Sequence, residues 1–287
     1  MDQGKDTQDV VLEFLRRVVD NRELRTEYML KLAPLAAKVI PVISTYFEKD
    51  NLPGSIGIQE KTLRVKFQKL AFRTSFRTLK NDLTAVAGCA KPQDYFFVDL
   101  EDIPVDLFDA EIILVKDLLK SFTACPIILL RSALSKNITN SGLDHGEVVP
   151  KVDNELMNHY KSIGGNSFAD YSGIKKDDVT DGGGISPGFI FYDATQNQYY
   201  GFRTTEKKKK LEHFLEIIIP KVLNSDATRR MHASPLPFLS MDNKGWDIIN
   251  KMESGTEKSK SAAKFKRISM EHYLHCIKTR IDGGELI

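Results

Sequence analysis

Residues 95–131 read YFFVDLEDIPVDLFDAEIILVKDLLKSFTACPIILLR, and this stretch contains the pattern that decides the fold. Two short apolar runs, at 95–99 and 127–131, each end on a charged residue. Between them, apolar residues recur at helical spacing over 107–122. The stretch therefore predicts a strand, a helix and a second strand parallel to the first.

The alternation of strand and helix extends in both directions from this stretch. We predict further strands at 39–44, 65–73 and 167–170, and helices at 11–18, 76–86 and 152–163. Asp9 is a candidate cap of the first helix, and Gly88 is a candidate end of the second. The chain thus contains the alternating pattern of a parallel α/β sheet.

The second half of the chain departs from this alternation. Apolar runs at 189–192 and 199–202 flank a short polar segment and predict a β-hairpin. Further helices are predicted at 211–218, 242–252 and 268–277, with Pro220 ending or kinking the first of them, and a flexible turn is predicted at 181–184.

The predicted fold is α/β, a TIM-barrel-like single domain over residues 1–287 with an inserted β-hairpin. Residues 1–36 form an N-terminal helical segment and residues 242–287 a C-terminal helical extension. Barrel closure would remove exposed strand edges, whereas a three-layer open sandwich is the competing architecture.

Composition narrows the class of protein. The 41 basic and 39 acidic residues give a net charge of +2, so no global field favours nucleic acid or a membrane. No apolar run approaches the roughly 20 residues of a spanning helix, and the polar first residues predict no signal peptide. Three widely spaced cysteines suggest neither a disulfide framework nor a zinc site, which fits a reducing, cytoplasmic location.

Four strand-end charges form the main candidate site, namely Arg73, Asp99, Arg131 and Asp170. The polar ends of parallel strands meet at one edge of a sheet, which predicts that they share one rim. The arginines could clamp a phosphate or carboxylate, and the aspartates could act as a base or hold a hard metal ion. The alternative is that these charges form a structural salt-bridge network.

Two hydroxyl residues follow Asp170 and complete this candidate ligand-binding rim. Tyr171 and Ser172 could take part in a site, or they could belong to an Asx-type turn that ends the strand. The absence of a G-x-S-x-G motif argues against Ser172 as a nucleophile. The sequence identifies neither a catalytic residue nor a cofactor.

Two lysine-rich stretches offer a weaker candidate for nucleic-acid binding. Their basic residues are Lys207, Lys208, Lys209, Lys210, Lys264, Lys266 and Arg267. Because no aromatics alternate with these residues, a solvated face is the favoured explanation of the two stretches. His272 and His275 lie three apart on a predicted helix, but no third metal ligand is evident, so no metal site is predicted.

Four short motifs resemble those of the phage T4 beta-protein family and its bacterial relatives. They are Ile40-Pro41-Val42-Ile43, Phe96-Phe97-Val98-Asp99-Leu100, Phe168-Ala169-Asp170-Tyr171-Ser172 and Lys266-Arg267-Ile268-Ser269-Met270-Glu271-His272-Tyr273. The third is the most specific. The family's usual opening R-G-K-x-x-E segment is matched only by Gly4-Lys5 and Asp6, so any site that uses that segment is altered here.

The resemblance implies a TIM-barrel-like domain and a role in phage–host conflict, because genes of such proteins often neighbour nuclease-like proteins and mobile elements. The leading hypothesis is therefore a binding protein for defence or counter-defence that acts with a protein partner, such as a nuclease-like neighbour. One alternative is an enzyme for a phosphorylated or nucleotide substrate at the barrel mouth. A second is nucleic-acid binding through the lysine-rich stretches.

Overall fold

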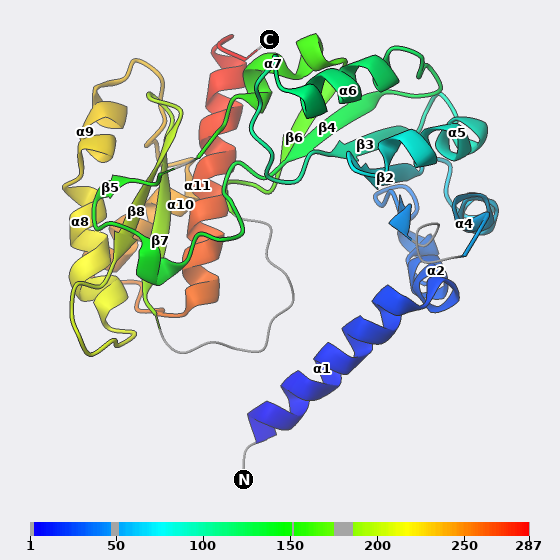
Figure 1. Cartoon of the computed structure of the whole chain (residues 1–287). Helices are drawn as coiled ribbons and strands as arrows, with labels where there is room; N and C mark the ends of the chain where they lie inside the picture. Colours follow the sequence, from blue (N-terminus) through cyan, green and yellow to red (C-terminus); the bar gives the residue numbers. More distant parts are fainter. Residues whose placement is uncertain (1–2, 47–51, 151, 175–185, 287) are drawn as a thin grey trace. The chain divides into compact units, whose positions relative to one another are not determined.

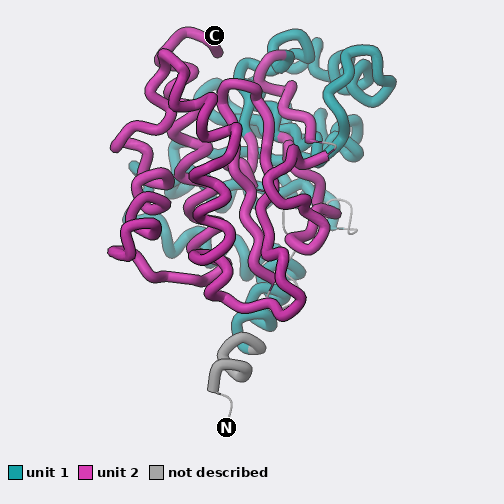
Figure 2. The backbone as a smooth tube through the Cα atoms, turned by 90° about the vertical axis from the view of Figure 1, so that its left-hand side faces the viewer, with its two compact units in different colours: residues 1–130, 159–169 teal, residues 131–158, 170–287 magenta. Residues whose placement is uncertain are grey.

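The computed structural model describes residues 3–46, 52–150, 152–174 and 186–286. The chain forms two compact units, shown in different colours in Figure 2. The first unit contains residues 1–130 and 159–169, and the second contains residues 131–158 and 170–287. Each unit is described by itself below.

The first unit is built around a parallel sheet (Figure 1). Its strands are β1 (Val42–Ser44), β2 (Ala71–Ser75), β3 (Tyr95–Asp99), β4 (Ile127–Arg131) and β6 (Ser167–Asp170), in the order β1-β2-β3-β4-β6. Its helices are α1 (Gln3–Asp20), α2 (Arg22–Leu30), η1 (Ala33–Leu35), α4 (Ser55–Arg64), α5 (Leu79–Cys89), α6 (Ala110–Leu119) and α7 (Leu156–Ile163). The boundary between the units passes through β4, α7 and β6, so that Arg131 and Asp170 belong to the second unit.

Burial of apolar side chains explains why these short runs form central strands. Phe72, Phe96, Val98 and Leu129 are fully buried, as expected for a parallel sheet with both faces covered. β1 to β4 pair in parallel, with Phe72 opposite Phe96. The parallel α/β sheet is thus confirmed, whereas its closure into a barrel stays a prediction.

The predicted strand at 65–73 was wrong over most of its length. Residues 55–64 form α4, which the sequence analysis missed, and Val65 beyond it is 75% exposed. β2 begins only at Ala71 and continues to Ser75, so Arg73 lies inside the strand rather than at its end. Residues 65–70 form a turn and an irregular segment after the helix. Phe67 and Leu70 of this segment are buried in the core, whereas Val65 is exposed.

The helix predictions in this unit differ from the structure in their details. α1 begins at Gln3, so Asp9 lies within the helix and is not its cap. α5 ends at Cys89, one residue after the predicted end at Gly88, and the N–H of the capping residue Ala90 bonds to the Val86 carbonyl. α2 lies within the predicted N-terminal helical segment 1–36, although it was not predicted as a separate helix.

The second unit is built on an antiparallel sheet with several helices. Its strands are β5 (Glu147–Val148), β7 (Gly188–Asp193) and β8 (Gln198–Arg203), in the order β5-β8-β7. Its helical elements are η2 (Asn140–Gly142), the π-helix η3 (Phe214–Ile218), α8 (Ile219–Leu223), α9 (Asp226–Ala233), α10 (Lys244–Glu253) and α11 (Ala262–Asp282). The β7–β8 hairpin is confirmed, and it belongs to this separate sheet rather than to the parallel one.

Side chains of α11 cover one edge of the antiparallel sheet. Ser269 Oγ donates to the Ile190 carbonyl at 2.6 Å, and His272 Nε2 lies 2.8 Å from the Tyr192 carbonyl. α10 packs closely against α11 because Gly245 has no side chain; a Cβ there would lie 2.5 Å from the Ile268 carbonyl oxygen. These contacts close a strand edge that would otherwise be open to pairing.

The helix predictions in this unit were partly right. The final helix is much longer than 268–277, because it begins at Ala262 behind the Ser261 cap. Pro220 does not end its helix; it lies in the first turn of α8, where its missing N–H costs no hydrogen bond. α9 was not predicted. The predicted turn at 181–184 lies outside the described residues.

Candidate functional site

The carboxyl ends of β2 and β3 carry a network of arginines and carboxylates. Arg73 donates to the Asp99 carboxylate, and the second Asp99 oxygen accepts the Glu101 N–H at 2.9 Å. Asp99 is 3% exposed, so its charge depends on these donors. The structure therefore brings together Arg73 and Asp99, and it pairs them with each other.

Glu101 extends this network and was missed from the sequence. Its backbone φ is 59°, a left-handed conformation that is uncommon for a residue with a side chain. Its carboxylate accepts from Ser75 Oγ at 2.9 Å and pairs with Arg77 at 3.4 Å. The only sequence signal was the acidic pair that directly follows β3, Glu101 and Asp102.

Arg131 belongs to a different ion pair, in the second unit. Its guanidinium lies 3.3 Å from the Asp153 carboxylate, and it also donates to the Asp153 carbonyl. Arg131 is 4% exposed, so a partner is needed to offset the cost of burying its charge. Asp153 lies in the polar stretch after β4 and carried no signal of its own in the sequence.

Asp170 at the end of β6 has a neutral partner, Tyr273 of α11. The Tyr273 hydroxyl donates to one carboxylate oxygen of Asp170, and the Ser172 N–H donates to the other at 2.6 Å. Ser172 and Gly173 have φ values of 56° and 70°. The Asx-type turn predicted as one alternative is therefore present, and a ligand-binding role of Ser172 stays a prediction. Tyr171 lies within this turn.

Burial sets the protonation of this pair. It raises the pKa of Asp170, and the hydrogen bonds from Tyr273 and the Ser172 backbone oppose that rise. Burial also raises the pKa of Tyr273 and of Tyr199 well above the usual range. Asp170 further raises the Tyr199 pKa and Arg131 lowers it, so both charges act on one buried tyrosine. A carboxyl group with a raised pKa is a candidate proton donor or acceptor.

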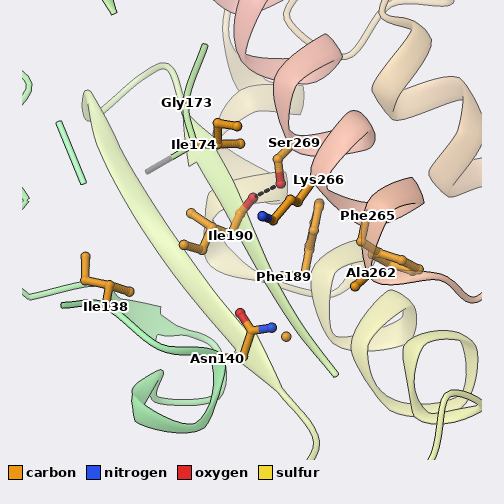
Figure 3. Close-up of a pocket in the computed structure, with 11 residues that line it drawn as sticks. Ile138, Asn140, Gly173, Ile174, Phe189, Ile190, Ala262, Phe265, Lys266 and Ser269 are labelled. Atoms are coloured by element: carbon orange, nitrogen blue, oxygen red, sulfur yellow. Dashed lines mark hydrogen bonds between the residues drawn. The ribbon is translucent and has the colours of Figure 1, made fainter. Parts of the chain in front are cut away.

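The two motif segments around Asp170 and Tyr273 also meet at a pocket (Figure 3). Gly173 and Ile174 contribute one side of it, and Lys266 and Ser269 of α11 contribute another. The pocket encloses about 560 Å³ of empty space, part of it open to solvent. Sequence analysis had placed Lys266 in a basic stretch but had no means of placing it beside Gly173.

The lysine-rich stretches lie on the surface of the second unit. Lys207 to Lys210 are exposed in the segment before η3. Lys264 pairs with Glu257 and Arg267 with Glu271, each at 2.8 Å. Nucleic-acid binding through these residues stays a prediction, and these ion pairs reduce the positive charge available to a phosphate backbone.

The histidine and cysteine residues provide no metal site among the described residues. His272 is fully buried and stacks on Phe191 at 4.2 Å. Burial lowers its pKa to about 4. The neutral ring accepts from the Asn243 amide and donates to the Tyr192 carbonyl, which makes His272 a link between α10, α11 and β7.

An exposed apolar surface on α1 and the segment after it was missed by sequence reasoning. Val10, Val11, Phe14, Leu15 and Val19 of α1 are 37–66% exposed. Tyr28, Leu32 and Leu35 are also at least 37% exposed, and Phe14 meets Tyr28 edge-on at 5.0 Å. Helical periodicity indicated an amphipathic helix, but periodicity alone does not say whether the apolar side is covered.

Comparison with known proteins identifies a family. A family model described as "Beta protein" matches residues 2–278. No curated protein and no solved structure matches the chain. Across the described part of the chain, no helix is both long and apolar enough to cross a membrane.

Proposed function

This chain belongs to the Beta protein family, and on that premise we propose that it is a recognition protein in phage–host conflict that works by binding a protein partner. The observation that carries this proposal is the exposed apolar surface of residues 10–35. Contiguous apolar patches on a folded protein mark interaction sites.

The geometry of α1 indicates how such a partner would bind. Val11, Phe14, Leu15 and Val18 recur at the i, i+3, i+4 and i+7 spacing of a helix that inserts one side into an apolar groove. Burying a Val, Leu or Phe side chain contributes about 1.5–3 kcal/mol, so several of them together are needed to offset the loss of translational and rotational freedom on association. The opposite side carries Glu13 and Arg16, of opposite charge. The matching partner is therefore a protein with an apolar groove.

The strand-end charges support binding over catalysis. Arg73 is paired with Asp99, and Arg131 is paired with Asp153. These contacts are typical of a structural network, in which the charges satisfy one another.

An enzymatic role is the second candidate, favoured by one observation. Asp170 is a partly buried carboxyl group with a raised pKa and a tyrosine hydroxyl on one oxygen. Such a group is suited to general acid–base chemistry on a phosphorylated or nucleotide substrate.

Phage infection of cells that produce the protein tests both candidates. We expect wild type to change the efficiency of plating relative to empty vector, and Leu15→Glu to abolish the effect because it places a charge on the apolar side of α1. Glu13→Gln, on the opposite side of the same helix, is the matched control and should retain the effect. Asp170→Asn should also retain it.

Two outcomes would contradict the proposal. If Leu15→Glu behaves as wild type while Asp170→Asn is inactive at unchanged Tm, the enzymatic candidate replaces it. If wild type itself has no effect on any phage tested, the role in phage–host conflict is lost. A separate measurement, light scattering of the purified protein, shows which protein covers the apolar side of α1. A dimer would indicate a second copy of this chain, and a monomer would indicate a different protein.

A further inference from the structure

An exposed apolar patch lies at the start of α6 in the first unit, and Figure 1 shows this helix beside the parallel sheet. Leu107 and Phe108, in the turn before the helix, are 36% and 90% exposed. Ile113 and Leu114 of the helix itself are 43% and 53% exposed. We call these four residues the α6 patch. Among the described residues, no other large apolar side chain is as exposed as Phe108.

The two sides of α6 explain why the patch is left uncovered. Ile112, Val115 and Leu119 are buried and belong to the core of the unit. Ile113 and Leu114 lie on the other side of the helix, where a surface helix ordinarily carries polar residues. The α6 patch therefore adds little to the core, and its apolar area is available to a partner.

Two side-chain hydrogen bonds hold the turn that presents Phe108. Asp106 Oδ1 accepts the Phe108 N–H at 2.9 Å, and Asp109 Oδ1, at the N-cap of α6, accepts the Glu111 N–H at 2.7 Å. An apolar residue directly before the cap often packs against the residue in the position of Ile113. At 90% exposure Phe108 does not bury its ring in this way. A partner can therefore cover the ring without first ordering the backbone that carries it.

The surface around the α6 patch is acidic. Residues 106–117 contain four acidic residues and one basic residue, Lys116, although the whole chain has a net charge of +2. Asp106, Asp109 and Glu111 are exposed, and none of them forms an ion pair within the part of the chain that the structure describes. A partner that binds here gains from positive charge around its own apolar site.

We propose that the α6 patch is a docking surface for a protein with an apolar groove bordered by lysine or arginine side chains. Phe108 and Leu107 insert into the groove, Ile113 and Leu114 cover its edge, and the acidic residues face the basic border. The α6 patch lies about 70 residues beyond the α1 surface in the sequence and is matched by a basic partner site. The two proposals therefore stand or fall independently.

Selection of peptides from a displayed random library on the full-length protein tests the apolar part of the proposal. We expect peptides that wild type retains and Phe108→Ser rejects to combine apolar residues with lysine or arginine. Their consensus peptide, measured by fluorescence anisotropy, should bind Phe108→Ser at least about tenfold more weakly than wild type, because one buried aromatic side chain is lost.

A triple variant, Asp106→Asn with Asp109→Asn and Glu111→Gln, tests the charges. Asparagine accepts a backbone N–H as aspartate does, so the turn and the cap are retained. At about 0.05 M salt the triple variant should bind the consensus peptide about tenfold more weakly than wild type, and at about 0.5 M salt the difference should largely disappear.

The matched control is Val65→Ser, which removes another highly exposed apolar side chain of the same unit. Val65 precedes β2 whereas Phe108 follows β3, so the two lie toward opposite ends of these parallel strands. Val65→Ser should bind the consensus peptide as wild type does, and so should Leu15→Glu, which alters the α1 surface.

Four results would overturn the proposal. The selection yields no peptide that Phe108→Ser rejects, or Phe108→Ser and Val65→Ser weaken the consensus peptide equally. The triple variant binds as tightly as wild type at about 0.05 M salt, which would remove the basic partner. Leu15→Glu abolishes binding, which would assign the peptide to α1 instead.

Discussion

Asp99 and Asp170 occur in the same sequence context and have opposite electrostatic environments. Each is the last residue of an apolar strand, Asp99 of β3 and Asp170 of β6. Asp99 is paired with the Arg73 guanidinium, so a full positive charge offsets its burial. Asp170 is held by a tyrosine hydroxyl and a backbone N–H, both neutral, and its pKa is raised.

The comparison teaches that a strand-end aspartate has no fixed role. An arginine neighbour makes it a member of a structural ion pair, whereas burial without a cationic neighbour leaves it with a raised pKa, which the hydrogen bonds from neutral donors only partly oppose. Only the second arrangement leaves a carboxyl suited to proton transfer.

The largest effect is expected from removing the Tyr273 ring. Tyr273 is 1% exposed and contacts the rings of Tyr192 and Tyr199 at 4.9 and 6.0 Å. Tyr273→Ala should lower the free energy of unfolding by about 4 kcal/mol, as for other buried aromatic truncations. Urea unfolding of wild type and Tyr273→Ala measures this loss.

Tyr273→Phe separates the ring from the hydroxyl in that experiment. It keeps the packing and removes only the donor to Asp170, so a loss of about 1 kcal/mol is expected. A loss as large as that of the alanine variant would mean that the hydrogen bond, not the packing, stabilises this region.

A smaller effect is expected from neutralising the two aspartates. Asp99→Asn should cost about 2 kcal/mol, because the half-exposed Arg73 loses its counter-charge and solvent screens part of the loss. Asp170→Asn should cost about 1 kcal/mol, because the single amide oxygen can accept from Tyr273 or from the Ser172 N–H but not from both. Equal losses in thermal and urea unfolding would remove the distinction between the two aspartates.

The smallest effect is a difference in pH dependence between Asp170 and a second paired carboxylate of the first unit, Asp94. Burial favours a higher pKa for Asp94, but hydrogen bonds from Arg64 and from the Leu70 and Lys91 N–H groups outweigh it and lower the pKa. Asp94 therefore contributes stability above its ordinary pKa of 3.8 and loses it as the pH falls through the lowered value.

Asp170 has the opposite sign. Because its folded-state pKa is raised, its contribution is complete below 3.8 and is lost as the pH rises through the raised value. Unfolding free energies of wild type, Asp94→Asn and Asp170→Asn between pH 3 and 7 measure both slopes. Relative to its asparagine variant, wild type should gain stability with rising pH at Asp94 and lose it at Asp170. Slopes of the same sign would contradict the assignment.

Local patterns allowed much of the secondary structure to be predicted. The strands at 95–99, 127–131 and 167–170 have the predicted bounds, because each is an apolar run between turn residues. The strand prediction for 65–73 was wrong because the buried residues Phe67 and Leu70 belong to a turn after α4. A short apolar sequence does not distinguish a strand from a buried turn. The partners Asp153, Glu101 and Tyr273 were not predicted.

The sequence by itself determined the parallel α/β sheet, the β-hairpin and the family, because these depend on local periodicity and short motifs. The tertiary structure alone decided that Asp99 has an arginine partner and Asp170 a tyrosine partner 103 residues away. It also decided that the apolar side of α1 is exposed and that Lys266 lies over a pocket lined by Gly173. The reason is physical: pairing and burial depend on which distant segments pack together, and residue order does not record that.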